Sequence, residues 1–170
     1  MSSMESNVTG EGTYGCVHHP PLYCKNSRTK DIKMISKLME TYEANKELTE
    51  YVLIDKIDRA KQFYLGIPKK CALGYEESNK YAESNRKAIK NCKMNKEVEE
   101  FPEDYSLLLM KNGGLNLRQF SQKMHGLEKN NENKQKMENF WIECHRLFLG
   151  IKKFLDSGYI HHDLKPQNIV

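Results

Sequence analysis

Hydrophobic and polar positions in the first half of the chain alternate in short runs, a pattern typical of β-strands. Residues 8–17 predict a strand, a glycine-rich turn and a second strand, and residues 33–38 predict a short third strand. Residues 40–58 have the composition of a helix with one apolar side. Residues 63–73 could form a strand at a sheet edge, and residues 105–110 are the clearest candidate for a buried strand.

The second half of the chain has a helical pattern. Residues 76–104 are polar and predict a mostly exposed insertion, with a short helix inside it. A break at 112–114 (Asn-Gly-Gly) follows the last strand, and residues 117–124 predict a short helix. After a polar loop over 126–136, apolar residues recur at helical spacing up to a terminating glycine. These residues include Met137, Phe140, Trp141, Cys144, Leu147, Phe148, Ile151, Phe154 and Leu155, and they predict a long amphipathic helix with a core-facing stripe.

Composition narrows the class of protein. The chain has 170 residues, 38% of them hydrophobic and 29% charged, with 27 Lys and Arg against 23 Asp and Glu. No apolar run is long enough to cross a membrane, and the first residues lack the features of a secretory signal. Lysines are interleaved with glutamates along the chain, which argues against a specific nucleic-acid interface. A soluble, cytoplasmic protein is therefore expected.

The five cysteines are scattered and include no CxxC pair. In a chain without a signal peptide, this distribution predicts reduced thiols in a cytosol-like compartment. Cys16, His18, His19 and Cys24 lie close together in the sequence, but their spacing matches none of the usual zinc patterns. A metal site there is not expected.

Residues 10–17 (GEGTYGCV) fit the pattern GxGxxGxV. Glycines allow a backbone to approach phosphate oxygens closely and to adopt positive φ. The same pattern occurs in dinucleotide-binding folds, where a helix begins directly after the third glycine. Because Pro20 and Pro21 follow so soon here, a strand–turn–strand arrangement is favoured.

Residues 160–170 (IHHDLKPQNIV) contain the most informative pattern in the chain. An acid is followed by a lysine two residues later and by an asparagine five residues later. Asp163 could accept the proton of an attacking hydroxyl, Lys165 could neutralise charge on a transferred phosphoryl group, and Asn168 could offer an amide oxygen to Mg²⁺. The loop is predicted to carry out phosphoryl transfer.

With both motifs, the sequence resembles the eukaryotic-type Ser/Thr protein kinases, and within them the divergent kinases of large DNA viruses. The resemblance implies an α+β, protein-kinase-like fold: a β-rich small lobe over residues 1–111, then a hinge and incomplete large lobe over 112–170. It implies ATP and Mg²⁺ as cofactors, a protein substrate, and a location in the host cytoplasm or the virion. The residues that it places around the nucleotide are Gly10, Glu11, Gly12, Thr13, Tyr14, Gly15, Val17, Met110 and Asn112.

The family also requires a strand lysine for the α- and β-phosphates and a glutamate that pairs with it. Lys37 is favoured over Lys33 because apolar residues flank it, as in a buried strand. Its partner is Glu47 or Glu50. The surroundings of Glu47 are closer to the viral pattern, so Glu47 is preferred.

Two features depart from the family. His162 stands where the family has arginine, which suggests that no phosphorylated activation loop is bound there. The chain also ends at Val170, before the DFG segment whose Asp holds Mg²⁺. A missing C-terminal segment could supply it, and its absence argues against activity of these residues alone. The alternative function is therefore a truncated pseudokinase that binds a nucleotide or a partner protein without catalysis.

Overall fold

The computed structural model describes residues 5–128 and 130–170, and the described chain divides into two compact units. The first contains residues 5–54 and 66–112, and the second contains residues 55–65 and 113–170. The division at 112 lies one residue from the predicted lobe boundary, but segment 55–65 joins the second unit. Residues 1–4 of the predicted small lobe and Lys129 of the predicted polar loop lie outside the described residues.

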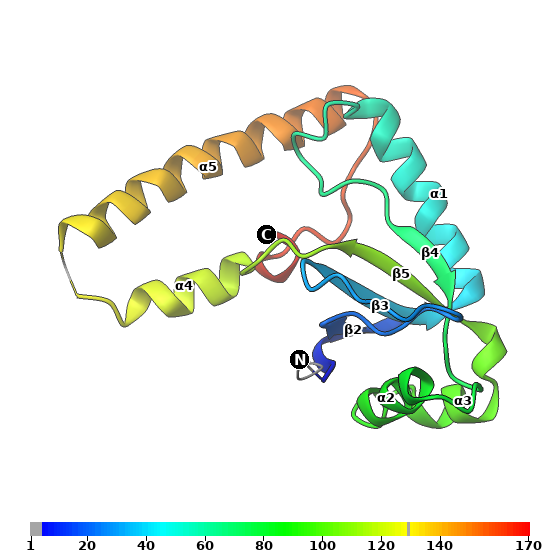
Figure 1. Ribbon diagram of the computed structural model, residues 1–170. Coiled ribbons are helices and arrows are strands. Elements are labelled where there is room, and N and C mark those ends of the chain that lie inside the picture. The colour runs from blue at the N-terminus through cyan, green and yellow to red at the C-terminus, as the bar shows by residue number, and fades with distance from the viewer. Residues whose placement is uncertain (1–4, 129) are drawn as a thin grey trace. The chain divides into compact units, whose positions relative to one another are not determined.

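An antiparallel sheet of five strands, in the order β1-β2-β3-β5-β4, forms the framework of the first unit (Figure 1). Its strands are β1 (Asn7–Gly12), β2 (Gly15–His19), β3 (Met34–Glu40), β4 (Lys69–Ala72) and β5 (Tyr105–Lys111). β3 and β5 are central and pair along their whole length, from Met34 opposite Lys111 to Glu40 opposite Tyr105. Four of the strands lie close to their predicted positions.

The two faces of this sheet are covered by different elements, as the alternation of side chains requires. On one face, Met39 and Leu108 are buried with Ala44 of the helix α1 (Thr41–Ile57), and Leu48 packs against this cluster. On the other face, Leu38 and Leu107 belong to a larger core. Each central strand therefore contributes to two separate apolar layers.

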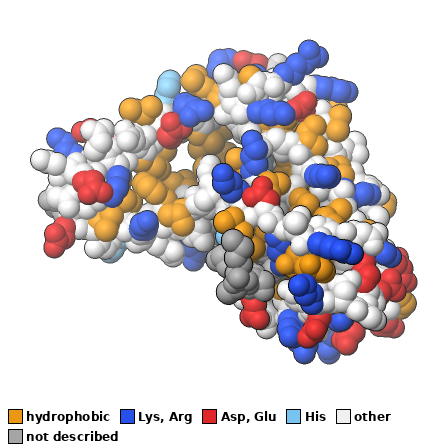
Figure 2. Space-filling model, in the orientation of Figure 1, with side chains coloured by type: hydrophobic (Ala, Val, Ile, Leu, Met, Phe, Trp, Pro, Cys, Tyr) orange, Lys and Arg blue, Asp and Glu red, His pale blue; other side chains and the backbone are white. Residues whose placement is uncertain are grey.

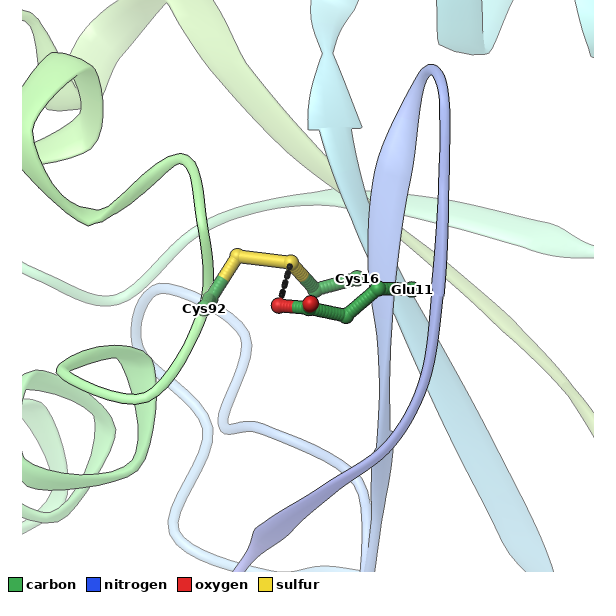
Figure 3. Close-up of side chains that lie close together, drawn as sticks. All are labelled: Glu11, Cys16 and Cys92. Atoms are coloured by element: carbon green, nitrogen blue, oxygen red, sulfur yellow. Dashed lines mark hydrogen bonds between the residues drawn. A yellow bond between two sulfur atoms is a disulfide. The ribbon is translucent and has the colours of Figure 1, made fainter.

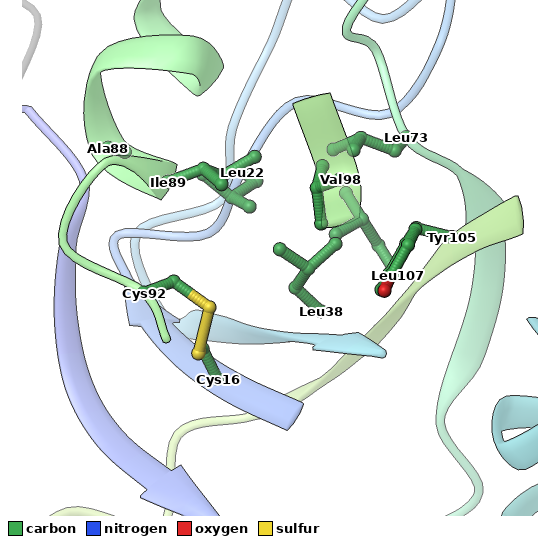
Figure 4. Packing of buried hydrophobic residues seen from close by; sticks show 10 residues of the cluster. All are labelled: Cys16, Leu22, Leu38, Leu73, Ala88, Ile89, Cys92, Val98, Tyr105 and Leu107. Atoms are coloured by element: carbon green, nitrogen blue, oxygen red, sulfur yellow. A yellow bond between two sulfur atoms is a disulfide. The ribbon is translucent and has the colours of Figure 1, made fainter. Parts of the chain in front are cut away.

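The insertion over 76–104 covers that second face. Most of its residues are exposed, as predicted, but a few of its side chains are buried against the sheet. It contains α2 (Lys80–Ile89), α3 (Asn95–Glu100) and a short 3-10 helix, Pro102–Asp104. Figure 4 shows Ile89 and Val98 packed among residues of the sheet and the loops around it. So polar a segment can cover the sheet because few apolar residues are needed to cover a narrow one. The buried cluster consists of Cys16, Leu22, Leu38, Leu73, Ala88, Ile89, Cys92, Val98, Tyr105 and Leu107.

Asn85 explains how so polar a helix can pack against the core. Its side chain is fully buried, and its amide donates to the carbonyls of Tyr23 at 2.8 Å and Gly74 at 2.6 Å. Its Oδ1 accepts from the N–H of Tyr23 at 2.9 Å. One asparagine thus satisfies backbone groups of two loops that would otherwise lose hydrogen bonds on burial.

The strand predicted over residues 63–73 is shorter than expected. Only Lys69–Ala72 forms β4, directly after the buried Pro68, which lacks an N–H for the ladder. Residues 63–65 of the predicted strand belong to the second unit. There the ring of Phe63 lies against Gly150, where an added Cβ would be 2.8 Å from a ring carbon.

The second unit is built from α4 (Leu117–His125), α5 (Asn131–Asp156) and a short 3-10 helix, Pro166–Asn168. The predicted short helix is confirmed. The predicted polar loop was too long because Asn130 caps α5 by accepting from the N–H of Asn133 at 2.9 Å. At the other end Gly158 has φ of +75° and Tyr159 N–H donates to the carbonyl of Phe154, the capping pattern predicted from the glycine.

The apolar stripe of α5 is only partly covered, contrary to its predicted place in a core. Phe140 stacks on Phe120 of α4, with ring centroids 5.2 Å apart, and Gly150 is buried. Trp141 and Phe148, however, are 67% and 66% exposed. Much of the stripe that was predicted to face a core is therefore exposed among the described residues.

The structure confirms the α+β class. None of the helices, within the described ranges, is long and apolar enough to cross a membrane. Figure 2 shows Lys and Arg side chains mixed with Asp and Glu over the visible face, in keeping with the interleaved charges of the sequence.

Candidate functional site

The glycine-rich segment forms a tight hairpin between β1 and β2. Gly10 pairs with Val17 and Gly12 pairs with Gly15, so that only Thr13 and Tyr14 remain as the turn. A strand rather than a helix follows the third glycine. The strand–turn–strand prediction is confirmed, and the dinucleotide arrangement is excluded for this segment.

Close packing requires glycine at one of the three glycine positions of the hairpin and not at the other two. A Cβ on Gly15 would lie 2.4 Å from the carbonyl oxygen of Leu38, so the close packing of β2 on β3 requires glycine there. At Gly10 and Gly12 a Cβ would meet its nearest neighbour only at 3.9–4.0 Å. None of the three has positive φ, so that part of the expectation was wrong. Since the hairpin does not crowd Gly10 and Gly12, their backbone is open to close approach by another molecule.

Lys37 lies on β3, opposite Val17 of β2 and Leu108 of β5. Its Nζ is 2.5 Å from Oε2 of Glu47 on α1, and both side chains are about three-quarters buried, with 25% and 21% exposed. The predicted ion pair is therefore present, and it involves Glu47 rather than the exposed Glu50. It joins the sheet to α1 on the face that carries Val17.

The alternative lysine, Lys33, is exposed and precedes β3, as the sequence predicted. Its carbonyl accepts from the N–H of Asn112 at 2.9 Å. Asn112 and Met110 are two of the residues that the resemblance places around the nucleotide. The N–H of Asn112 therefore already has a hydrogen-bond partner. Met110 lies beyond the last residue pair of β4 and β5, which is Lys69 opposite Leu109.

Asp163, Lys165 and Asn168 lie together in the second unit. Nζ of Lys165 is 2.8 Å from Oδ2 of Asp163, and Nδ2 of Asn168 donates to the same oxygen at 3.0 Å and to the Asp163 carbonyl at 2.9 Å. The structure thus brings together all three residues predicted in this loop. All three side chains are exposed, so that a molecule in solution can reach them.

Local contacts hold the loop in this shape. Asn168 N–H donates to the carbonyl of Lys165 at 2.8 Å, closing the short turn that begins at Pro166. Leu117 N–H donates to the carbonyl of Ile169 at 2.8 Å, which fastens the loop to the first turn of α4. A proline in the first turn restricts the backbone further.

The electrostatics of the loop favour an ionised Asp163. The hydrogen bond from Lys165, with a smaller one from Asn168, lowers the pKa of the Asp163 carboxyl below its usual value. The group is exposed, so water screens much of this effect. At neutral pH Asp163 is a carboxylate, able to accept a hydrogen bond from a hydroxyl group.

These donors fit the cofactors that the motifs implied. Asn168 uses its amide nitrogen on Asp163, which leaves Oδ1 as a hard oxygen ligand suited to Mg²⁺. Lys37 offers an ammonium on the sheet face of Val17, and ammonium groups are common phosphate ligands. The residues that could hold ATP and Mg²⁺ are therefore present, each within its own unit.

A different cluster, Glu11, Cys16 and Cys92, resembles a metal site only in its atom types (Figure 3). The two sulfurs are bonded to each other at 2.04 Å, so neither is a thiolate ligand. A second disulfide joins Cys24 and Cys71. The prediction of reduced thiols was wrong for these four cysteines, and neither Cys16 nor Cys24 is a free thiolate that could ligate a metal.

Sequence reasoning missed three side chains that organise these units: Asn85, Lys93 and Asp58. Each acts on residues far away in the sequence. Lys93 contacts two residues of the glycine-rich hairpin, Thr13 and Glu11, which precede it by 80 and 82 residues in the sequence. Asp58 contacts Lys153, 95 residues later. No local pattern marks such residues.

The chain was compared with known proteins. No protein-family model matches it, and no curated protein matches it significantly.

Proposed function

We propose that this chain is the front part of an ATP-dependent serine/threonine protein kinase. The observation that carries the proposal is the arrangement of Asp163, Lys165 and Asn168, whose side chains meet on a single carboxylate oxygen. The order of the sheet strands and the Lys37–Glu47 pair support it, because both are compatible with a kinase-like small lobe.

The reaction assigns one role to each residue. The hydroxyl of a substrate serine or threonine donates its proton to Asp163 as its oxygen bonds to the γ-phosphorus, and the bond from that phosphorus to the ADP oxygen breaks. Lys165 stabilises the negative charge of the transferred group. Lys37 holds the non-transferred phosphates. Mg²⁺, held in part by Asn168, would neutralise phosphate charge when bound.

The preference for serine and threonine rests on the residues DLKPQN at 163–168, the form that resembles Ser/Thr kinases. The protein substrate would be recognised by its hydroxyl side chain and by surfaces that the motifs do not define. ATP and Mg²⁺ are the proposed cofactors, and a protein is the proposed substrate.

Transfer of the labelled γ-phosphoryl group of ATP to the chain itself and to basic protein substrates tests the proposal. Asp163→Asn keeps the size and the hydrogen-bonding geometry of the side chain but is a poor proton acceptor. We expect Mg²⁺-dependent incorporation that Asp163→Asn reduces at least a hundredfold. Equal incorporation by both proteins would overturn the assignment.

Measuring thermal stabilisation by ATP on the same protein distinguishes catalysis from nucleotide binding without catalysis. Mg²⁺-dependent stabilisation by ATP without any transfer would favour a pseudokinase that binds nucleotide. Absence of both effects would leave neither function standing.

A further inference from the structure

Lys93 connects the insertion to the tip of the glycine-rich hairpin. Its backbone N–H donates to Oε1 of Glu11 at 3.0 Å, and its Nζ donates to the carbonyl of Thr13 at 3.2 Å. The residue before it, Cys92, is bonded to Cys16. Two consecutive residues of the insertion therefore hold β1, the turn and β2.

The hairpin needs such support because its tip is exposed. Glu11, Gly12, Thr13 and Tyr14 are all exposed, whereas the Cys16–Cys92 disulfide is buried below them. A two-residue turn at the edge of a sheet has few packing contacts of its own. Lys93 is the side chain that reaches past the disulfide to the turn itself.

The hydrogen bond from Lys93 N–H also fixes the position of the Glu11 carboxylate. Glu11 pairs with Cys16, so the two side chains share one face of the hairpin, and Figure 3 shows both directed toward Cys92. Val17 and Lys37 belong to the opposite face. The alternation of side chains therefore places the Glu11 carboxylate on the face away from Lys37, and the hydrogen bond from Lys93 N–H holds it there.

We propose that Lys93 is a positioning residue for the glycine-rich turn, and that it raises the affinity of the chain for the phosphates of a nucleotide. This inference rests on the proposed function. A turn held in place before binding loses less conformational entropy when it closes on a ligand.

The test compares the affinities of MgATP and adenosine for four oxidised proteins: wild type, Lys93→Ala, Lys93→Arg and Lys96→Ala. Lys96 is an exposed lysine of α3 and serves as the matched control for charge. We expect Lys93→Ala to weaken MgATP binding about five- to tenfold, the value of one hydrogen bond to a well-placed group. Binding of adenosine, which lacks phosphates, stays unchanged, and Lys93→Arg restores most of the MgATP affinity.

Amide hydrogen exchange supplies a measurement that needs no nucleotide. In Lys93→Ala the amides of residues 12–15 exchange faster, while those of β3 and β5 keep their protection. A purely structural role for Lys93 would lower the affinities for MgATP and adenosine together and speed exchange throughout the sheet. That result, or an unchanged affinity for MgATP, would overturn the inference.

Failure of the proposed function gives a different result. If the wild-type chain itself binds neither MgATP nor adenosine, the nucleotide site is wrong, and the positioning role falls with it. If the wild type binds MgATP and the two alanine variants at 93 and 96 behave alike, only the role of Lys93 is overturned.

Discussion

Lys153 of α5 neutralises Asp58, a carboxylate with no exposed surface, across a separation of 95 residues. The Nζ of Lys153 is 3.0 Å from Oδ1, and the N–H of Phe63 donates to Oδ2 at 2.8 Å. Because a buried carboxylate is costly without partners, this pair fixes the segment after α1 against α5.

Lys153→Met is expected to destabilise the chain by about 2–4 kcal/mol, because it leaves Asp58 buried without its cation. The matched control is Lys152→Met. Lys152 pairs with Asp156 at 2.6 Å, but both side chains are exposed, and such a pair contributes under about 1 kcal/mol. Urea unfolding measures both free energies. Equal values for the two variants would contradict this role for Asp58.

Lys37→Met is expected to lower the affinity for MgATP about tenfold or more, because a largely buried ammonium makes a strong hydrogen bond to phosphate. Glu47→Gln should have a smaller effect in the same direction, since the amide holds Lys37 less firmly. Lys33→Met removes the exposed lysine of the same region and should leave affinity unchanged. Calorimetric titration with MgATP measures all three. A loss of affinity in Lys33→Met equal to that in Lys37→Met would reject the assignment.

His18 predicts a pH dependence of stability. Its ring is fully buried, and burial lowers its pKa from 6.5 to about 4, with a further lowering by Lys30. The backbone of Cys16 and Ala88 offsets part of this effect, although neither ring nitrogen has a hydrogen bond of ordinary geometry among the described residues.

The unfolded chain therefore takes up a proton at His18 between pH 6.5 and 4 while the folded chain does not. Above pH 6.5 the group has no effect, and below that the free energy of unfolding falls, by roughly 3 kcal/mol at pH 4. His18→Gln removes this loss, whereas His125→Gln, at an exposed site, retains it. Denaturant unfolding across this pH range makes the comparison. The same slope in His18→Gln and wild type would show that other groups cause it.

Asn85→Ala removes three hydrogen bonds of a fully buried side chain. The Tyr23 N–H and the Gly74 carbonyl lose this partner, while the Tyr23 carbonyl keeps its hydrogen bond from the N–H of Gly74 at 3.2 Å. We expect a loss of about 2–4 kcal/mol in unfolding free energy. Asn91→Ala changes an exposed asparagine of the same insertion and should cost little. Thermal unfolding followed by circular dichroism distinguishes the two variants. A small effect in both would mean that α2 is held by its apolar residues alone.

The disulfides predict a specific labelling pattern. Of the five cysteines, Cys144 is the free one among the described residues, so alkylation of the denatured, unreduced chain should modify one thiol. After reduction, all five react. Loss of the Cys16–Cys92 link, which spans 76 residues, should cost about 4 kcal/mol. Five modified thiols before reduction would restore the earlier expectation of a reduced protein.

Local patterns were sufficient for much of the fold. The hairpin around Gly12, the strand ending at Lys111, α1 and the glycine that ends α5 were all predicted, because each depends on periodicity or on residues with special backbone preferences. The Lys37–Glu47 pair was also predicted, because the resemblance to protein kinases implies a strand lysine paired with a glutamate of the following helix.

Other features could not be predicted in this way. Most of the insertion is exposed, as predicted, but its few apolar residues are separated in the sequence, and only the tertiary structure shows that Ala82, Ile89 and Val98 are buried. The pairing of Cys16 with Cys92 likewise depends on packing, since thiols 76 residues apart carry no sign of their partners.

The sequence alone was enough to predict a candidate site at residues 160–170 and the glycine-rich hairpin at residues 10–17. Both are short segments whose residues act on their immediate neighbours. The tertiary structure decided which distant residues support them: Lys93 at the turn, Asn85 under the insertion and Asp58 beside Lys153. The physical reason is that a buried polar group is stable only beside its partner, and only the folded chain brings the two together.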